Sequence, residues 1–83
     1  MIKIGAVLQA VRMRAGLNQE DLAYKLHLSQ SDISKIEKDR KLPALDTLAR
    51  WTEVTNAKEV LVAYLCGIDG IAIMQSVLQL FGG

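Results

Sequence analysis

The sequence predicts an all-α protein of five to six short helices, and three observations support this fold class. Apolar residues recur at helical spacing along the chain, and residues typical of helix starts and stops separate these periodic stretches. No stretch alternates polar and apolar residues as a half-buried strand does. The 83 residues are 51% apolar with a single proline, which excludes a disordered chain. The length suits one domain and excludes a large enzyme or a multidomain sensor.

Three helices are predicted in the front half of the chain. The first should end near Gly16, and its apolar face is Ile4, Val7, Leu8 and Val11. Asn18 is expected to cap the second helix with Asp21 in a capping box, and that helix should stop around residues 25–27. Ser29 is expected to cap the third helix with Asp32 in the same role. The inward faces of these two helices comprise Leu22, Ala23, Leu26, Ile33 and Ile36.

A fourth helix should begin just after Pro43, because proline disfavours helix in the residue before it. Its buried face is predicted as Leu45, Leu48, Ala49 and Thr52, with Trp51 at the edge of that stripe. Asn56 and Glu59 predict a capping box for a fifth helix through Cys66, stopped by Gly67. Cys66 is expected to be a small buried hydrophobe. A sixth helix, capped by Asp69, is predicted over residues 70–81.

Charge is distributed unevenly along the chain. Residues 1–43 carry eight basic and five acidic side chains, whereas residues 44–83 carry two and four. A basic N-terminal half is typical of contact with a polyanion. An apolar C-terminal half is typical of packing within the fold or of pairing with another chain. Scattered solubilising charge is the simpler alternative, and a balance of +3 alone does not exclude it.

Residues 19–38 form a unit of two short capped helices joined by a tight turn. Each helix is too short to be stable alone, so the two must pack closely. The later helix then presents one outward polar face, which suits the major groove of DNA because that groove admits an α-helix and displays donor and acceptor patterns. Its N-terminus also offers free backbone amides to phosphates.

The stretch RMRAGLNQEDLAYKLHLSQSDISKIEKDRKLPALDTLARW strongly resembles the lambdoid repressor/Cro-type (XRE-like) helix-turn-helix DNA-binding proteins. The resemblance covers about residues 4–56 and implies a lambda-repressor-like fold. We expect a helix-turn-helix DNA-binding core over residues 1–56. Residues 57–83, which include an apolar tail, are expected to be a C-terminal helical dimerisation extension of the same domain.

The resemblance also implies roles for individual residues. Four residues occupy the base-reading positions of the recognition helix: Gln30, Ser31, Ser34 and Lys35. Asn18 and Gln19 match the phosphate-contacting start of the preceding helix, while Lys38, Arg40 and Lys41 sit where the following loop touches the DNA backbone, and Arg14 is a further candidate phosphate contact. Arg12 and Glu37 match a structural ion pair between the first and third helices.

Two positions depart from the family pattern. His27 stands where the family has glycine in a left-handed turn, so we expect strain of about 1–2 kcal/mol there. A ligand-binding or pH-sensing role for His27 is the alternative interpretation. Ala44 replaces the usual capping serine or aspartate, which predicts a weakly capped fourth helix.

The tail from Val60 to Phe81 is largely apolar, but a central Asp69 between two glycines makes it a poor membrane span. Its apolar surface exceeds what one small core can cover and predicts a symmetric homodimer. The expected dimer-interface residues are Ile71, Met74, Val77, Leu78 and Phe81. The alternative is that the tail merely covers the domain's own core.

Catalytic, cofactor and metal sites are not expected. One histidine and short exposed acids give no credible catalytic arrangement, and Cys66 is the only other soft metal ligand. The sequence lacks a recognisable signal peptide, and its single cysteine does not indicate an oxidising compartment.

Together these observations predict a cytoplasmic, sequence-specific regulator of transcription that binds double-stranded DNA as a homodimer, similar to a phage or mobile-element repressor. Two alternatives stay open. One is an antitoxin whose apolar tail binds a toxin or another protein antagonist; the other is an interaction module that keeps the fold without binding DNA.

Overall fold

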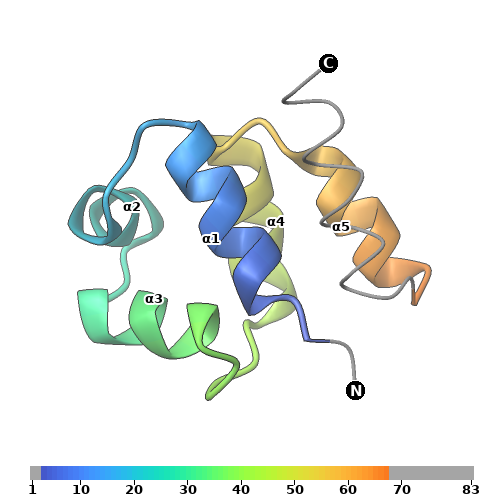
Figure 1. Cartoon of the computed structure of the whole chain (residues 1–83), viewed down its shortest axis with the longest axis horizontal. Coiled ribbons are helices and arrows are strands. Elements are labelled where there is room, and N and C mark those ends of the chain that lie inside the picture. The colour runs from blue at the N-terminus through green and yellow to red at the C-terminus, as the bar shows by residue number, and fades with distance from the viewer. Residues whose placement is uncertain (1–2, 68–83) are drawn as a thin grey trace.

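The computed structural model describes residues 3–67, and within them it shows five helices and no strand (Figure 1). The helices are α1 (Gly5–Arg14), α2 (Gln19–Leu26), α3 (Gln30–Glu37), α4 (Leu45–Val54) and α5 (Lys58–Leu65). In Figure 1, α1 crosses α4 at the centre, α2 and α3 lie to one side, and α5 lies to the other. The all-helical prediction is therefore confirmed.

One hydrophobic core joins all five helices. α1 packs on α3 and α4, and α2 packs on both of these helices as well. The buried apolar residues are Ile4, Val7, Leu8, Val11, Leu22, Ala23, Leu26, Ile33, Ile36, Leu48, Trp51, Ala57 and Val60. The inward faces predicted for the first three helices all belong to this set. Because Ala57 and Val60 belong to it too, α5 is part of the same packed unit.

Asn18 and Ser29 cap α2 and α3 as predicted, but of these two helices only α2 has the full capping box. The Asn18 side chain accepts a hydrogen bond from the Asp21 amide at 2.7 Å, and the Asp21 carboxylate accepts one from the Asn18 amide at 3.2 Å. Ser29 Oγ accepts from the Asp32 amide at 3.1 Å. At α4, Ala44 provides no side-chain cap, as its side chain predicts.

The first four helices each end at a residue with a left-handed backbone: Gly16, His27, Asp39 and Asn56. His27 has φ 56° and ψ 39°, so the conformation expected from the family's glycine is confirmed. The Leu28 amide donates to the Ala23 carbonyl at 2.9 Å, and the His27 amide donates to the Tyr24 carbonyl at 3.3 Å. This pair of bonds satisfies carbonyls at the end of α2 and turns the chain toward α3.

The capping box predicted for the fifth helix is wrong. Asn56 has φ 54°, and its amide donates to the Glu53 carbonyl at 3.1 Å. Asn56 therefore ends α4 and cannot adopt the extended backbone that an N-cap needs. Ala57 takes the N-cap position of α5 without a side-chain cap.

The predicted buried face of the fourth helix is also partly wrong. Trp51 is fully buried rather than at an edge, and its indole nitrogen donates to the Leu8 carbonyl at 3.2 Å. Leu45 is 60% exposed. The buried stripe runs through Leu48, Trp51, Thr52 and Thr55, so α4 turns its tryptophan toward α1.

Cys66 follows the last residue of α5 and is exposed, which corrects the expectation that it is buried. The sixth helix predicted over 70–81, including Ile71, Met74, Val77, Leu78 and Phe81, lies outside the described residues. Within residues 3–67, no helix has the length and apolar character that a bilayer crossing requires.

Candidate nucleic-acid interface

α2 and α3 form a tight helical pair. Only His27, Leu28 and Ser29 separate the two helices, and the left-handed His27 makes the sharp turn possible. Ala23 is 5% exposed, so the small side chain lets the two helices approach closely. Ile33 and Ile36 are buried beneath α3 and hold it against the core.

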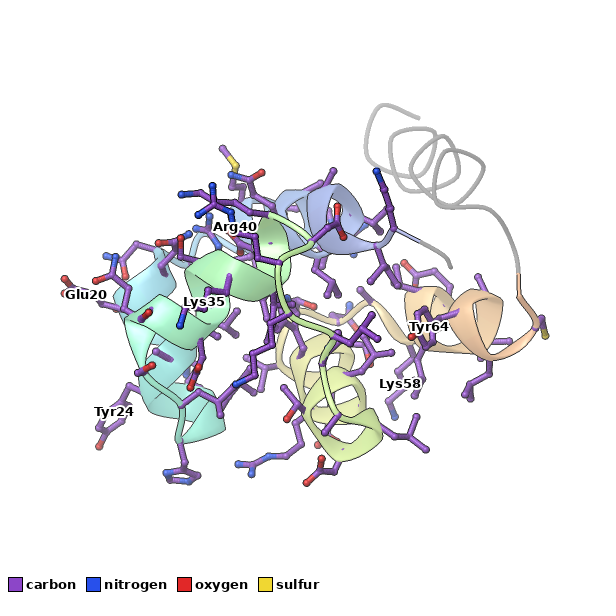
Figure 2. All side chains as sticks on the ribbon, turned by 90° about the horizontal axis from the view of Figure 1, so that it is seen from below. Glu20, Tyr24, Lys35, Arg40, Lys58 and Tyr64 are labelled. Atoms are coloured by element: carbon purple, nitrogen blue, oxygen red, sulfur yellow. The ribbon has the colours of Figure 1, made fainter. Side chains whose placement is uncertain are left out.

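The opposite face of α3 is polar and faces solvent. Gln30, Ser31 and Lys35 are exposed, and Ser34 is partly buried. Figure 2 shows Lys35 projecting from α3 and Arg40 from the turn that follows it, whereas Lys58 and Tyr64 lie on α5 at the other end of the molecule. All four residues predicted to read bases therefore lie on the same helix.

A buried ion pair joins α1 to α3, between the two residues that the resemblance implies. Arg12 Nε donates to Glu37 Oε2 at 2.6 Å, and Arg12 Nη2 donates to Glu37 Oε1 at 3.1 Å. The two side chains are only 9% and 3% exposed. Arg12 Nη1 also donates to the Leu17 carbonyl at 2.8 Å. The guanidinium thus fixes α3 against the end of α1.

Gln19 extends this ion pair to the start of α3. Its Nε2 donates to Glu37 Oε1 at 3.0 Å, and its Oε1 accepts from Gln30 Nε2 at 3.2 Å. A continuous polar chain therefore runs from Arg12 through Glu37 and Gln19 to Gln30. The resemblance implies a phosphate contact for Gln19 and does not reveal this bridging position. The two partners, Glu37 and Gln30, follow Gln19 by 18 and 11 positions in sequence.

The α1 N-terminus lies against the end of α3. A Cβ atom on Gly5 would lie 2.7 Å from the Glu37 carbonyl carbon and from the Ile36 carbonyl oxygen, so this close approach requires glycine. The Gly5 amide donates to Asp39 Oδ1 at 2.9 Å. These contacts position the turn that carries Lys38 and Arg40 beside α3.

Lys41 differs from the two other cations that follow α3. Its ammonium lies 3.0 Å from Asp32 Oδ1, near the start of α3. The hydrogen bond from Lys41, followed by those from Ser29, lowers the pKa of the Asp32 carboxyl below its ordinary value of 3.8. Lys38 and Arg40 are exposed and form no ion pair with any residue from 3 to 67.

Arg14 lies away from α3, at the junction of α4 and α5. Its Nη2 donates to the Asn56 carbonyl at 3.3 Å and lies 3.7 Å from a Glu59 oxygen. The structure therefore does not group Arg14 with the other candidate phosphate contacts. The sequence gives no signal for this pairing, because Glu59 lies 45 residues after Arg14.

Metal ligands are not clustered in this part of the protein. Across residues 3–67, histidine, cysteine, aspartate and glutamate side chains form no group of three or more that could hold a metal ion.

Comparison with known proteins gives two findings. The helix-turn-helix domain family matches residues 3–65. The chain is also 31% identical over 71 residues to the HTH-type transcriptional regulator ImmR of Bacillus subtilis (strain 168). The alignment covers 86% of this chain and 54% of ImmR, so the chain spans about half the length of this curated relative. No solved structure matches the chain significantly.

Proposed function

Because the chain belongs to the helix-turn-helix domain family, we propose that it is a sequence-specific double-stranded DNA-binding regulator of transcription. The family assignment agrees with the expectation that the protein is not an enzyme. The match to a transcriptional regulator supports the same proposal.

One observation carries the proposal: an exposed polar helix face held on a rigid frame. α3 is fixed from below by Ile33 and Ile36 and from the side by the Arg12–Glu37 pair. A major groove about 12 Å wide admits one α-helix, whose N-terminal residues reach base edges. Gln30 and Ser31, at the N-terminus of α3, are exposed to solvent, which supports this mode of binding.

Within this proposal the side chains divide into readers and positioners. Gln30, Ser31, Ser34 and Lys35 contact bases; glutamine pairs with adenine, and lysine donates to guanine. Gln19 presents Gln30 through their shared hydrogen bond. The backbone contacts come from Asn18, Gln19, Lys38 and Arg40. Lys41 is available only if it leaves Asp32, and Arg14 only if it leaves Asn56 and Glu59.

We further propose that the protein acts as a phage-type repressor in the cytoplasm and binds a two-fold operator as a homodimer. On α5, Val62 is 59% exposed and Leu65 is 61% exposed, which supports an interface at the end of the molecule opposite α3. The predicted tail residues would extend it. Half-sites would then lie about one helical turn, ~34 Å, apart.

Selection of bound sites from random duplexes tests the DNA-binding proposal. Anisotropy titrations then compare binding to the selected duplex with binding to a scrambled duplex. Lys35→Ala should weaken binding to the selected duplex by roughly 5- to 150-fold and spare the scrambled one. Arg40→Ala should weaken both and lower the salt slope by about 0.9. Lys58→Ala removes the same charge on α5 and is the matched control. Equal effects of all three changes would refute the assignment of roles.

Sedimentation tests the dimer. Because Ala57 and Val60 are core residues, truncation after residue 56 would damage the fold, so paired substitutions Val62→Ser and Leu65→Ser are the better change. The proposal expects a dimer that weakens in this variant. A full-length chain that stays monomeric at micromolar concentration would contradict it, and a chain that pairs only with a different protein would favour the antitoxin alternative.

A further inference from the structure

One partly exposed carboxylate lies on the helix proposed to read DNA. α3 carries two acids, and Glu37 is buried in its pair with Arg12. Asp32 is the other, and its side chain is 28% exposed. A carboxylate near DNA phosphates is repulsive, so its place on the recognition helix requires an explanation.

The partner of Asp32 comes from the turn after α3. The Lys41 ammonium donates to Asp32 Oδ1 at 3.0 Å, across nine positions of sequence. The lysine side chain is 50% exposed, so the pair lies at the surface, where such a pair contributes little to stability. The two unit charges offset each other, so the paired Lys41 adds little net positive charge to this part of the surface.

We propose that Asp32 is a positioning residue for Lys41 that holds its ammonium away from the DNA backbone and thereby lowers the sequence-independent affinity of the protein for duplex DNA. This inference rests on the proposed DNA-binding function. Lys38 and Arg40 show no such carboxylate partner within residues 3–67, so the restraint applies to one of the three cations of the turn.

The size of the effect follows from counterion release. Each phosphate that a cation neutralises adds about 0.9 to the steepness of the salt dependence, which is roughly eightfold in affinity at ~0.1 M salt. A Lys41 that stays with Asp32 adds no such contact. Asp32→Asn releases it, because the amide is neutral. The cap of α3 survives this change, since Ser29 Oγ accepts from the backbone amide of residue 32.

The test compares four proteins with the wild type on the scrambled and the selected duplex in anisotropy titrations at several salt concentrations. These are Asp32→Asn, Lys41→Met, the double variant, and Glu53→Gln, which makes the same charge change at an exposed position on α4. Circular dichroism checks that each variant is folded.

The inference expects Asp32→Asn to bind more tightly at ~0.1 M salt, by at most the roughly eightfold that one full contact supplies, with a slope steeper by up to about 0.9. Lys41→Met should have nearly the same salt slope as the wild type. The double variant should lack the tighter binding of Asp32→Asn, because the released cation is no longer present. Glu53→Gln should change neither quantity. A merely structural role for the pair would alter unfolding but not these slopes.

Three results would overturn the inference while leaving the proposed function intact. The first is an unchanged salt slope in Asp32→Asn. The second is a salt slope lowered by about 0.9 in Lys41→Met, which would mean that Lys41 contacts a phosphate in the wild type. The third is a loss of affinity in Asp32→Asn that is confined to the selected duplex, which would make Asp32 a base reader. A wild type that binds no duplex at low salt would overturn the proposed function, and this inference with it.

Discussion

Substitution of Arg12 by methionine gives the sharpest test of how α3 is held. The guanidinium donates two hydrogen bonds to Glu37 and one to the Leu17 carbonyl. Methionine fills much of the same volume but offers neither charge nor donor. Glu37, whose side chain is 3% exposed, would keep only the hydrogen bond from Gln19.

The expected cost follows from the uncompensated carboxylate. Removal of one partner from a buried pair costs about 3–5 kcal/mol, whereas replacement of both partners by apolar residues is often neutral or stabilising. In Arg12→Met/Glu37→Met, Gln19 and the Leu17 carbonyl also lose a partner, so we expect a net cost of at most ~2 kcal/mol. The double variant should therefore be more stable than Arg12→Met alone.

Urea unfolding followed by circular dichroism measures these differences. A chain of 83 residues has a total stability of about 4–12 kcal/mol, so Arg12→Met could be largely unfolded. Arg12→Lys, which keeps the charge but loses the two-pronged geometry, should then give a smaller, measurable loss. The reasoning is refuted if the double variant loses as much stability as the two single changes together, because the pair would then not be coupled.

Three further predictions concern backbone and charge. His27→Gly should raise the free energy of unfolding by about 1 kcal/mol because it removes left-handed strain, whereas His27→Ala should bring no gain; urea unfolding of both variants checks this. Gly5→Ala should destabilise by roughly 1–3 kcal/mol, despite the better helix propensity of alanine, because its methyl group meets the Glu37 backbone; an equal or higher thermal midpoint would contradict this. The Asp32 carboxyl should titrate below 3.8, and its pKa should rise in Lys41→Met; NMR titration of both proteins measures this. Because the pKa is lower in the folded state, the contribution of the pair to stability is present above the unfolded-state pKa and is lost as the pH falls through the folded-state pKa.

Local signals in the sequence predict most of the described fold. Asn18 and Ser29 cap helices because their side chains satisfy amides within three residues, and such short-range chemistry can be read from the chain. Asn56 shows where this fails, since asparagine suits both an N-cap and a left-handed helix end. Its neighbours in sequence do not decide between the two, whereas the packing of α4 against α5 does.

The candidate site is predictable in its outline but not in its pairings. The helix that presents Gln30 and Lys35 follows from helical periodicity and the family resemblance. The bridge through Gln19 and the engagement of Lys41 with Asp32 depend on side chains brought together by the turn between helices. The sequence predicts Trp51 at the edge of the buried stripe, whereas its hydrogen bond to α1 shows that it lies within the core.

The indole of Trp51 also gives the protein an intrinsic optical reporter. It is the only tryptophan of the chain, it is shielded from water, and its nitrogen is bonded to a carbonyl 43 residues earlier. Its emission should therefore shift to the red when α1 and α4 separate. The same fluorophore lies in the core rather than on the polar face of α3, so the loss of tertiary structure can be followed without an attached dye.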